Sequence, residues 1–275
     1  MRSAAAVGLF VLITANFAFP AAPEPGDEPA GRPTVVLLHG LARSASSMHD
    51  LAQALEGAGY HVCNVAYPSR EHSIAELSSR FVAPGIARCV QNAAEPANFV
   101  THSLGGIIVR ELAKAGSVQT FGRVVMLGPP NHGSEVVDAL GDWYIFGAIN
   151  GPAGGELGTS KDSVPQQLGP APFQVGIVAG NRSINWINSL MIPGPDDGKV
   201  SVESAKLEGM QDFVIVRASH PFLMKDRDVI EQTIRFLTSG CFAHEEERPP
   251  VGSAQQCVPA EVAASAPSAL RQSRD

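Results

Sequence analysis

One serine, Ser103, has the sequence context of a catalytic nucleophile. It follows a short apolar run that begins at Phe99, and it precedes Leu104-Gly105-Gly106, which leads into further apolar residues. On a sharp turn from strand to helix, a serine projects its hydroxyl outward, because nearby glycines let the turn close and the helix N-terminus directs N–H groups to the same place. The segment therefore predicts a nucleophile elbow that combines a nucleophile with an anion-binding site.

One position departs from the Gly-x-Ser-x-Gly pattern that is usual for such turns. Thr101 stands where the first glycine is expected. A β-branched residue fits the strand that ends there, but its side chain must pass close to the following helix, so a neighbour has to make room. A Ser-x-Gly turn taken alone can also be a turn without chemistry, and the hypothesis therefore depends on the rest of the chain.

An upstream segment supports the hypothesis. Residues 35–38 are four consecutive branched apolar residues, which suit a strand buried on both faces of a parallel sheet. His39-Gly40 then ends this strand in a loop where backbone can approach a ligand closely. With these two motifs, the chain resembles the α/β-hydrolase superfamily over roughly residues 33–240, in particular small bacterial lipases and esterases with a His-Gly oxyanion loop.

The resemblance implies a fold and an oxyanion hole. The fold is an α/β-hydrolase fold, with a mostly parallel, doubly wound sheet, helices on both faces and an inserted lid-like region. In that superfamily, one oxyanion donor comes from the loop after the first strand and the other from the residue after the nucleophile. These donors correspond to the backbone N–H groups of Leu41 and Leu104.

A serine hydroxyl is a poor nucleophile at its ordinary pKa, so it needs a base, and the base needs an acid to orient it. The order in the superfamily is serine, acid, histidine. Three histidines follow Ser103, namely His132, His220 and His244. His244 lies in a charged tail and His132 precedes any suitable acid, so we expect His220, in a loop after a predicted strand, to be the base.

The acid is expected in the loop after the preceding strand. Residues 193–200 form the acidic turn between that strand and the histidine, and Asp197 matches the Asp-x-x-Val placing of bacterial lipases. Asp196 is the alternative, because Asp-Gly turns are also common for purely local reasons. Glu203 and Asp212 are more distant alternatives.

Two other polar residues lie near the elbow in the sequence. We expect His102 to point away from the nucleophile and to have a positional role. Arg110 falls about two turns along the following helix, on its outer or packing face. Neither is expected to be catalytic.

Composition bounds the domain count and the partners. With 275 residues, of which 44% are hydrophobic, the chain can bury one sizeable core, which we assign to residues 33–243. The net charge of -7 and the lack of a basic run argue against binding to nucleic acid or to an anionic lipid surface.

The N-terminus has the layout of a secretory signal peptide. An apolar run over residues 4–19 is followed by a Pro/Glu/Gly/Asp linker at 23–32. We expect a signal peptide at residues 1–22, cleaved after Ala18 or Ala22, and a secreted or periplasmic protein without a stable membrane span. The alternative, an uncleaved anchor, would need about 20 apolar residues.

The four cysteines have no Cys-x-x-Cys spacing and no histidine partners at metal-ligand intervals, which argues against zinc. In an exported chain they are expected to be oxidised. We expect the pairs Cys63 with Cys89 and Cys241 with Cys257, which join neighbours in sequence, although the other two pairings stay open.

Strands and helices are expected to alternate along the domain. The helical region 73–92 is expected to divide or kink at Pro84-Gly85. The predicted strands cover residues 34–38, 61–66, 98–101, 123–127, 173–179 and 212–217, and the other predicted helices cover 47–57, 104–115 and 228–237.

Two regions depart from this alternation. Residues 130–170 are too long and too apolar for a simple connection, so they form either a lid or acyl pocket, or an excursion that packs its aromatic side chains on the core. Residues 244–275 have the composition of a largely disordered tail.

Together these features predict an exported carboxylic-ester hydrolase, an esterase or lipase that acts through a Ser103-Asp197-His220 triad and an acyl-enzyme. The alternatives are acyl transfer by the same triad and a non-catalytic ligand-binding scaffold. The expected partner is a small-molecule or lipid ester. The chemistry requires no metal or organic cofactor, no loop has the Asp/Asn pattern of a dedicated calcium site, and the sequence carries no signal for oligomeric state.

Overall fold

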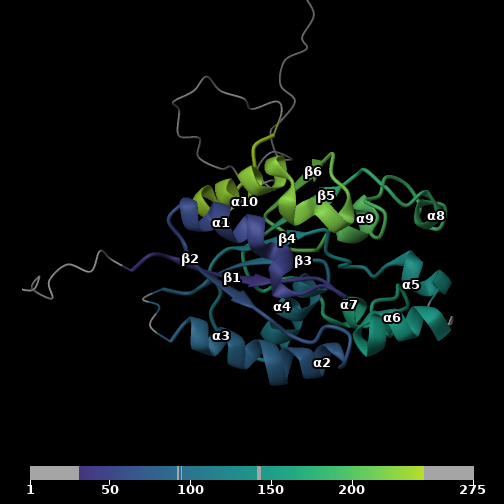
Figure 1. The fold of residues 1–275 in the computed structure, drawn as a ribbon, viewed down its shortest axis with the longest axis horizontal. Helices are drawn as coiled ribbons and strands as arrows, with labels where there is room; N and C mark the ends of the chain where they lie inside the picture. The colour runs from purple at the N-terminus through teal and green to yellow at the C-terminus, as the bar shows by residue number, and fades with distance from the viewer. Residues whose placement is uncertain (1–30, 92, 94, 141–143, 245–275) are drawn as a thin grey trace, which may run out of the picture. The chain divides into compact units, whose positions relative to one another are not determined.

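The computed structural model describes residues 31–91, 93, 95–140 and 144–244, with only the backbone for 144–149 (Figure 1). The described elements belong to one compact unit that begins at Arg32. The expected signal peptide and the tail beyond His244 lie outside the described residues. No helix within the described ranges combines the length and the apolar character needed to cross a membrane.

Six parallel strands form one sheet in the order β2-β1-β3-β4-β5-β6. The predicted strands and the doubly wound architecture are thereby confirmed. The strands are β1 (Thr34–Leu38), β2 (His61–Val65), β3 (Asn98–His102), β4 (Val124–Leu127), β5 (Val175–Gly180) and β6 (Asp212–Val216). The strands β1, β4 and β5 are buried along their whole length because both faces of the sheet are covered.

Alternate residues of each strand belong to two separate cores. Val35 and Leu37 pack with α1 (His49–Gly57) and α10 (Arg227–Ser239), whereas Val36 and Leu38 pack toward the opposite helices. Figure 1 shows α1 and α10 on one side of the sheet and the helices α2, α3 and α4 on the other. These last helices are α2 (Ile74–Glu76), α3 (Ala83–Cys89) and α4 (Leu104–Lys114). A slip of one residue in any strand would exchange the two cores.

The helical region predicted over residues 73–92 changes its helix type just before Pro84 and continues beyond it. Between α2 and α3 the chain forms a π-helical segment, Leu77–Val82, and the N–H of Ala83 bonds to the carbonyl of Ser78 five residues earlier. Pro84 then lies in the first turn of α3, where a missing N–H costs little. The expected interruption therefore takes the form of a wider turn.

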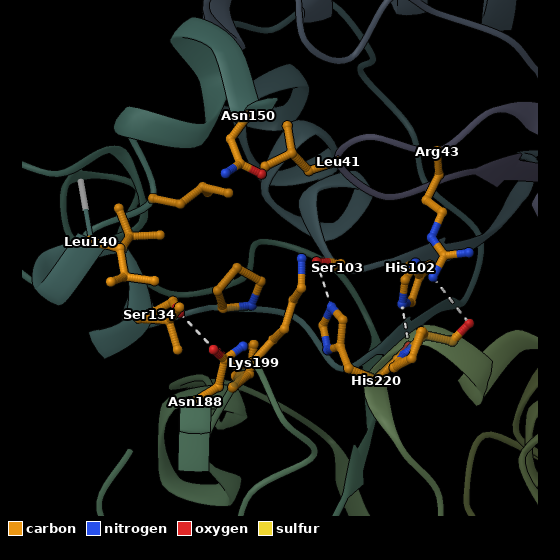
Figure 2. Close-up of a pocket in the computed structure, with 16 residues that line it drawn as sticks. Leu41, Arg43, His102, Ser103, Ser134, Leu140, Asn150, Asn188, Lys199 and His220 are labelled. Atoms are coloured by element: carbon orange, nitrogen blue, oxygen red, sulfur yellow. Dashed lines mark hydrogen bonds between the residues drawn. The ribbon is translucent and has the colours of Figure 1, made fainter. Parts of the chain in front are cut away.

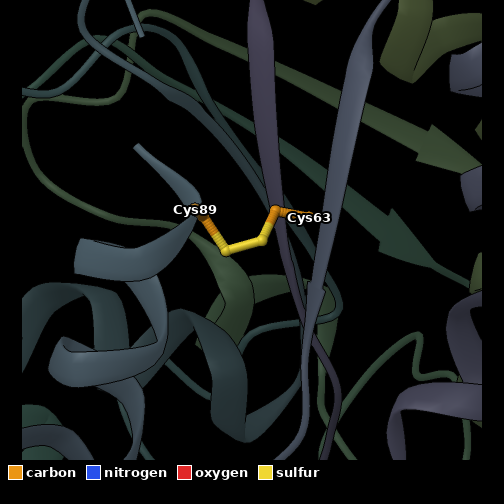
Figure 3. The surroundings of a disulfide bond; sticks show 2 residues. All are labelled: Cys63 and Cys89. Carbon is orange, nitrogen blue, oxygen red and sulfur yellow. A yellow bond between two sulfur atoms is a disulfide. The ribbon is translucent and has the colours of Figure 1, made fainter. Parts of the chain in front are cut away.

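A disulfide ties the edge strand β2 to α3 (Figure 3). Cys63 and Cys89 have their Cα atoms 5.9 Å apart, which is within the ordinary range for a bridge. The first predicted pair is therefore confirmed. The second predicted pair includes Cys257, which lies outside the described residues.

The region 130–170 contains short helices and no strand among its described residues. Its helices are α5 (Glu135–Leu140), α6 (Tyr144–Gly155) and α7 (Val164–Gln167). Within α6 the backbone turns at Gly151, which has a φ of 65°. Ala153 and Leu157 are buried in the core. Part of the region thus packs on the core, but the aromatic side chains of the packing hypothesis lie outside the described side chains, so both hypotheses stay open. The remaining elements are α8 (Trp186–Ser189), α9 (Val202–Ala205) and the 3-10 segments Ala45–Met48 and His220–Lys225.

Candidate active site

Ser103 occupies the turn between β3 and α4 in a strained backbone conformation. Its φ is 52° and its ψ is -118°. Within the described part of the chain, Ser103 and Ala42 are the two non-glycine residues with positive φ. Residues other than glycine rarely adopt this backbone conformation, and it persists only where the surrounding structure imposes it. The surrounding fold therefore holds the Ser103 backbone in a conformation that serine does not favour.

The glycines after Ser103 let α4 start close to the sheet. A Cβ atom at Gly105 would lie 2.6 Å from the carbonyl oxygen of Leu38 at the end of β1. At Gly106 a Cβ atom would lie 3.4 Å from Oγ1 of Thr101 and 3.2 Å from Cβ of Pro129. A side chain at Gly106 would therefore crowd Pro129 and Met126 first, and it would make only an ordinary contact with Thr101.

Ser103, His220 and Asp197 form one hydrogen-bonded chain. The Oγ atom of Ser103 lies 3.0 Å from Nε2 of His220, and Nδ1 of His220 lies 2.7 Å from Oδ2 of Asp197. The three residues are buried. Each follows a different strand, β3, β6 and β5, so their side chains meet at the carboxyl edge of the sheet. Because a carboxylate only accepts, Nδ1 carries the proton and Nε2 is free to accept the serine hydroxyl.

Asp197 and Asp196 have separate hydrogen-bond partners. The second oxygen of Asp197, Oδ1, accepts from the backbone N–H groups of Lys199 and Val200. In contrast, Oδ1 of Asp196 accepts from the N–H of Gly198 and from the hydroxyl of Ser189, which shapes the turn. Of the two neighbouring acids, Asp197 is the one that contacts the histidine.

The more distant acids are engaged elsewhere. Glu203 pairs with Lys206 at 2.7 Å. Asp212 accepts from the N–H of Phe242 and from Nε2 of His244. The structure therefore does not bring either of these carboxylates to His220.

The two expected oxyanion donors lie on segments that meet at Ser103. A Cβ atom at Gly40 would lie 3.2 Å from Cβ of Ser103, so the loop after β1 touches the elbow. Leu41 lines the same pocket as Ser103, and Leu104 is the buried first residue of α4. Their role as donors stays a prediction.

The His39 side chain and carbonyl are fixed beneath this loop. The His39 ring stacks on Tyr67 with ring centroids 4.0 Å apart, and the Tyr67 hydroxyl donates to the His39 carbonyl. Burial lowers the pKa of His39 and raises the pKa of Tyr67. Sequence reasoning missed Tyr67, whose only signal is an aromatic residue just after a strand.

His102 holds the backbone of the histidine loop. Its Nε2 atom donates to the carbonyl oxygen of His220 at 3.0 Å, since a carbonyl can only accept. Burial lowers the pKa of His102 well below the usual value, and the charges of His220 and Arg43 add to this shift. Its ring also lies 4.9 Å from the His220 ring and lines the same pocket as Ser103, so His102 does not simply point away from the site, and its positional role stays a prediction.

Arg110 lies on the packing face of α4, and both of its terminal guanidinium nitrogens have partners. It donates to the carbonyl oxygens of Asn131, Pro165 and Gly169 and to the Asn131 side chain. Burial lowers its pKa to about 10. Arg110 therefore fastens the region 130–170 to α4.

A pocket of about 160 Å³ opens above Ser103 (Figure 2). One part of its wall is apolar and another part is basic. The apolar residues are Leu41, Pro130, Val136, Val137, Leu140, Leu157, Val200 and Pro221, and the basic residues are Arg43 and Lys199 beside His102 and His220. Sequence reasoning missed both cations, although Lys199 is the only basic residue of the acidic turn 193–200.

Comparisons with known proteins bear on this architecture. No protein-family model and no curated protein sequence matches the chain. Among solved structures, the mature lipase BlEst2 from Bacillus licheniformis is 20% identical, with a TM-score of 0.62 and coverage of 78% of this chain and 96% of that one. The phospholipase PlaB from Legionella pneumophila is 16% identical, with a TM-score of 0.57 and coverage of 76% and 60%. The metagenomic carboxyl esterase MGS0156 is 20% identical, with a TM-score of 0.52 and coverage of 74% and 70%.

These similarities, with the six-stranded parallel sheet, define the class: the chain has the α/β-hydrolase fold. The solved proteins that it resembles within this class are named as lipases, phospholipases and esterases.

Proposed function

We propose that the protein is a serine hydrolase of carboxylic esters, with Ser103 as nucleophile, His220 as base and acid, and Asp197 as the orienting acid. The hydrogen-bonded chain from Ser103 Oγ through His220 to Asp197 carries the proposal. The strained backbone of Ser103, with a φ of 52°, adds support, because backbone strain of this kind is common at active sites.

In the proposed reaction, Oγ of Ser103 attacks the ester carbonyl carbon while its proton passes to Nε2 of His220. The tetrahedral oxyanion accepts hydrogen bonds from the N–H groups of Leu41 and Leu104. The bond to the alcohol oxygen then breaks, and His220 gives that oxygen the proton. Water, deprotonated by His220, attacks the acyl-enzyme, and the acid leaves as Ser103 recovers its proton.

The substrate class follows from the pocket and the similar structures. The apolar wall of Leu140, Val136 and Val137 suits an acyl chain, and this wall belongs to the region 130–170, which we propose as the acyl pocket. Lipases and esterases among the similar structures favour an acyl ester. We also propose export of the domain 33–243, since the Cys63–Cys89 bond is typical of oxidising compartments.

A fluorophosphonate probe tests the nucleophile directly. The wild-type protein is expected to form one adduct on Ser103, and Ser103→Ala to form none. The matched control is Ser134→Ala, which removes another hydroxyl from the same pocket and is expected to keep the adduct. Labelling of Ser103→Ala, or none in the wild type, would contradict the proposal.

Turnover defines the reaction and the acyl length. A panel of p-nitrophenyl esters from acetate to palmitate is expected to be hydrolysed by the wild type, with Ser103→Ala slower by about 10⁶. Addition of a simple alcohol distinguishes hydrolysis from acyl transfer, because a transferase would form the new ester in preference to the free acid.

A further inference from the structure

Two cations, Arg43 and Lys199, lie in the wall of the pocket beside Ser103. Both side chains are accessible to solvent there. Figure 2 shows the Arg43 guanidinium near His102 and the Lys199 side chain extending toward Ser103. None of the described residues that line this pocket is a carboxylate. The pocket is therefore cationic, although the chain has 27 acidic and 20 basic residues.

Neither cation has a carboxylate partner within the described part of the chain. Arg43 donates to the carbonyl oxygen of Pro221 at 3.4 Å, a long bond. Only the backbone of Lys199 bonds to Asp197 and Ser134. Cations elsewhere do pair, as Lys225 does with Asp50 and Arg227 with Glu231.

The nearest buried acid cannot neutralise this pair. Asp197 attracts Lys199, but both of its carboxylate oxygens already accept hydrogen bonds, from His220 and from backbone N–H groups. Partial desolvation in the pocket wall lowers the pKa of Lys199 although its side chain still reaches solvent, and repulsion from Arg43 lowers it further. Two like charges held together in a recess repel each other until an anion lies between them.

We propose that Arg43 and Lys199 bind an anionic group on the alcohol part of the substrate, so that the site prefers esters of phosphate- or carboxylate-bearing alcohols. This inference rests on the proposed ester hydrolysis. His220 must protonate the leaving alcohol, and Arg43 bonds to the residue next to His220, so the alcohol side of the pocket is the cationic side. In Figure 2, Leu140 and Arg43 lie on opposite sides of Ser103, and the Lys199 side chain ends close to Ser103 between them, so the acyl chain would extend toward Leu140.

Matched butyrate esters test this preference. They are 1-butyrylglycerol, which is neutral, 1-butyrylglycerol 3-phosphate, and 3-butyryloxypropanoate with its neutral methyl ester, so phosphate and carboxylate are tested separately. The wild type is expected to have a higher kcat/KM for an anionic ester than for its neutral partner. In Lys199→Gln and in Arg43→Gln this ratio is expected to fall about tenfold, mainly through KM, and Lys199→Glu is expected to reverse it.

Surface charges supply the matched controls. Lys225→Gln and Arg227→Gln remove the same charges away from the pocket and are expected to keep the wild-type ratio. If the pocket variants also keep it, the inference is wrong. An equal loss of kcat for neutral and anionic esters would likewise overturn it, because the cations would then stabilise the oxyanion.

A binding measurement separates this inference from the proposed function. The phosphate ester is titrated by calorimetry into Ser103→Ala and into Ser103→Ala/Lys199→Gln. The second protein is expected to bind about tenfold more weakly. If the double variant binds more weakly but the wild type hydrolyses no ester, the anion site is supported and the proposed hydrolase function is refuted. Hydrolysis that depends on Ser103, with equal affinities in the two proteins, would do the opposite.

Discussion

Nδ1 of His220 lies 2.7 Å from Oδ2 of Asp197, and the exposed fractions of these two residues are 4% and 1%. A carboxylate this deeply buried is costly unless its oxygens are satisfied. Backbone N–H groups of Lys199 and Val200 bind its other oxygen. In addition, the N–H of His220 donates to the carbonyl of Asp197 at 2.9 Å. The turn thus fixes both the tautomer and the direction of the imidazole.

Asp197→Asn is expected to lower kcat by about 10³ to 10⁴ without unfolding the protein, because an amide no longer holds the required histidine tautomer. The measurement is kcat on a p-nitrophenyl ester, with circular dichroism to confirm the fold. Asp196→Asn is the matched control, since the Asn oxygen can still accept from Gly198 and Ser189. Similar losses in the two variants would refute the assignment of Asp197.

The positive φ of Ser103 predicts a gain of stability on substitution by glycine. Ser103→Gly is expected to unfold with a free energy about 1 kcal/mol higher than Ser103→Ala, because only glycine adopts a φ of 52° without strain. Urea unfolding of these two variants measures the difference. At Ala115, which has a φ of -74°, the change to glycine is expected to destabilise instead. Equal stability of Ser103→Gly and Ser103→Ala would show that the turn is unstrained.

Gly40→Ala is expected to lower kcat at least tenfold. A Cβ atom there would lie 2.6 Å from Nδ1 of His102 and 3.2 Å from Cβ of Ser103, so the elbow or its supporting ring must shift, and small displacements of reacting groups are costly. Gly57→Ala is the matched control, because no atom outside the neighbouring backbone of its own helix lies within 4 Å of the new Cβ. It is expected to keep full activity and to stabilise α1 by about 0.5 to 1 kcal/mol. Full activity of Gly40→Ala would contradict the crowding.

The buried histidines predict loss of stability in acid. Burial lowers the pKa of His102 and of His39 below the ordinary value, so the unfolded chain binds more protons than the folded chain as the pH falls below about 6.5. The free energy of unfolding therefore has its full value above this pH. Below it, the free energy of unfolding decreases by at most about 1.4 kcal/mol per pH unit for each histidine. Urea unfolding between pH 7 and pH 5 measures the slope.

Two variants test whether His102 causes this dependence of the free energy of unfolding on pH. His102→Gln is expected to reduce it, since glutamine can still donate to the carbonyl of His220 but does not titrate. His49→Gln, at an exposed position, is expected to leave it as in the wild type. The assignment fails if the two variants have the same slope.

Much of the fold was predictable because its signals are local. The apolar runs of β1 and β4 and the glycine at the end of α10 specify their elements without reference to distant residues. The acidic turn holding Asp197 was predictable because few acids lie between the last two strands.

The remaining parts of the site depend on contacts between distant segments. His102 and the carbonyl of His220 are 118 residues apart in sequence, and Tyr67 reaches the His39 carbonyl across 28. Residue types alone do not specify such pairs. The same holds for Arg43 and Lys199, each of which is an ordinary loop cation until the pocket brings them together.

The strand that precedes His220, β6, is one of the two edge strands of the sheet. Because β6 pairs with β5 alone, fraying of this single strand can carry the imidazole away from Ser103 while the other five strands keep their order. Warming is then expected to abolish catalysis several degrees before the far-ultraviolet signal of the sheet disappears. The highest temperature at which the protein is active would then be set by the stability of this edge strand and not by that of the core.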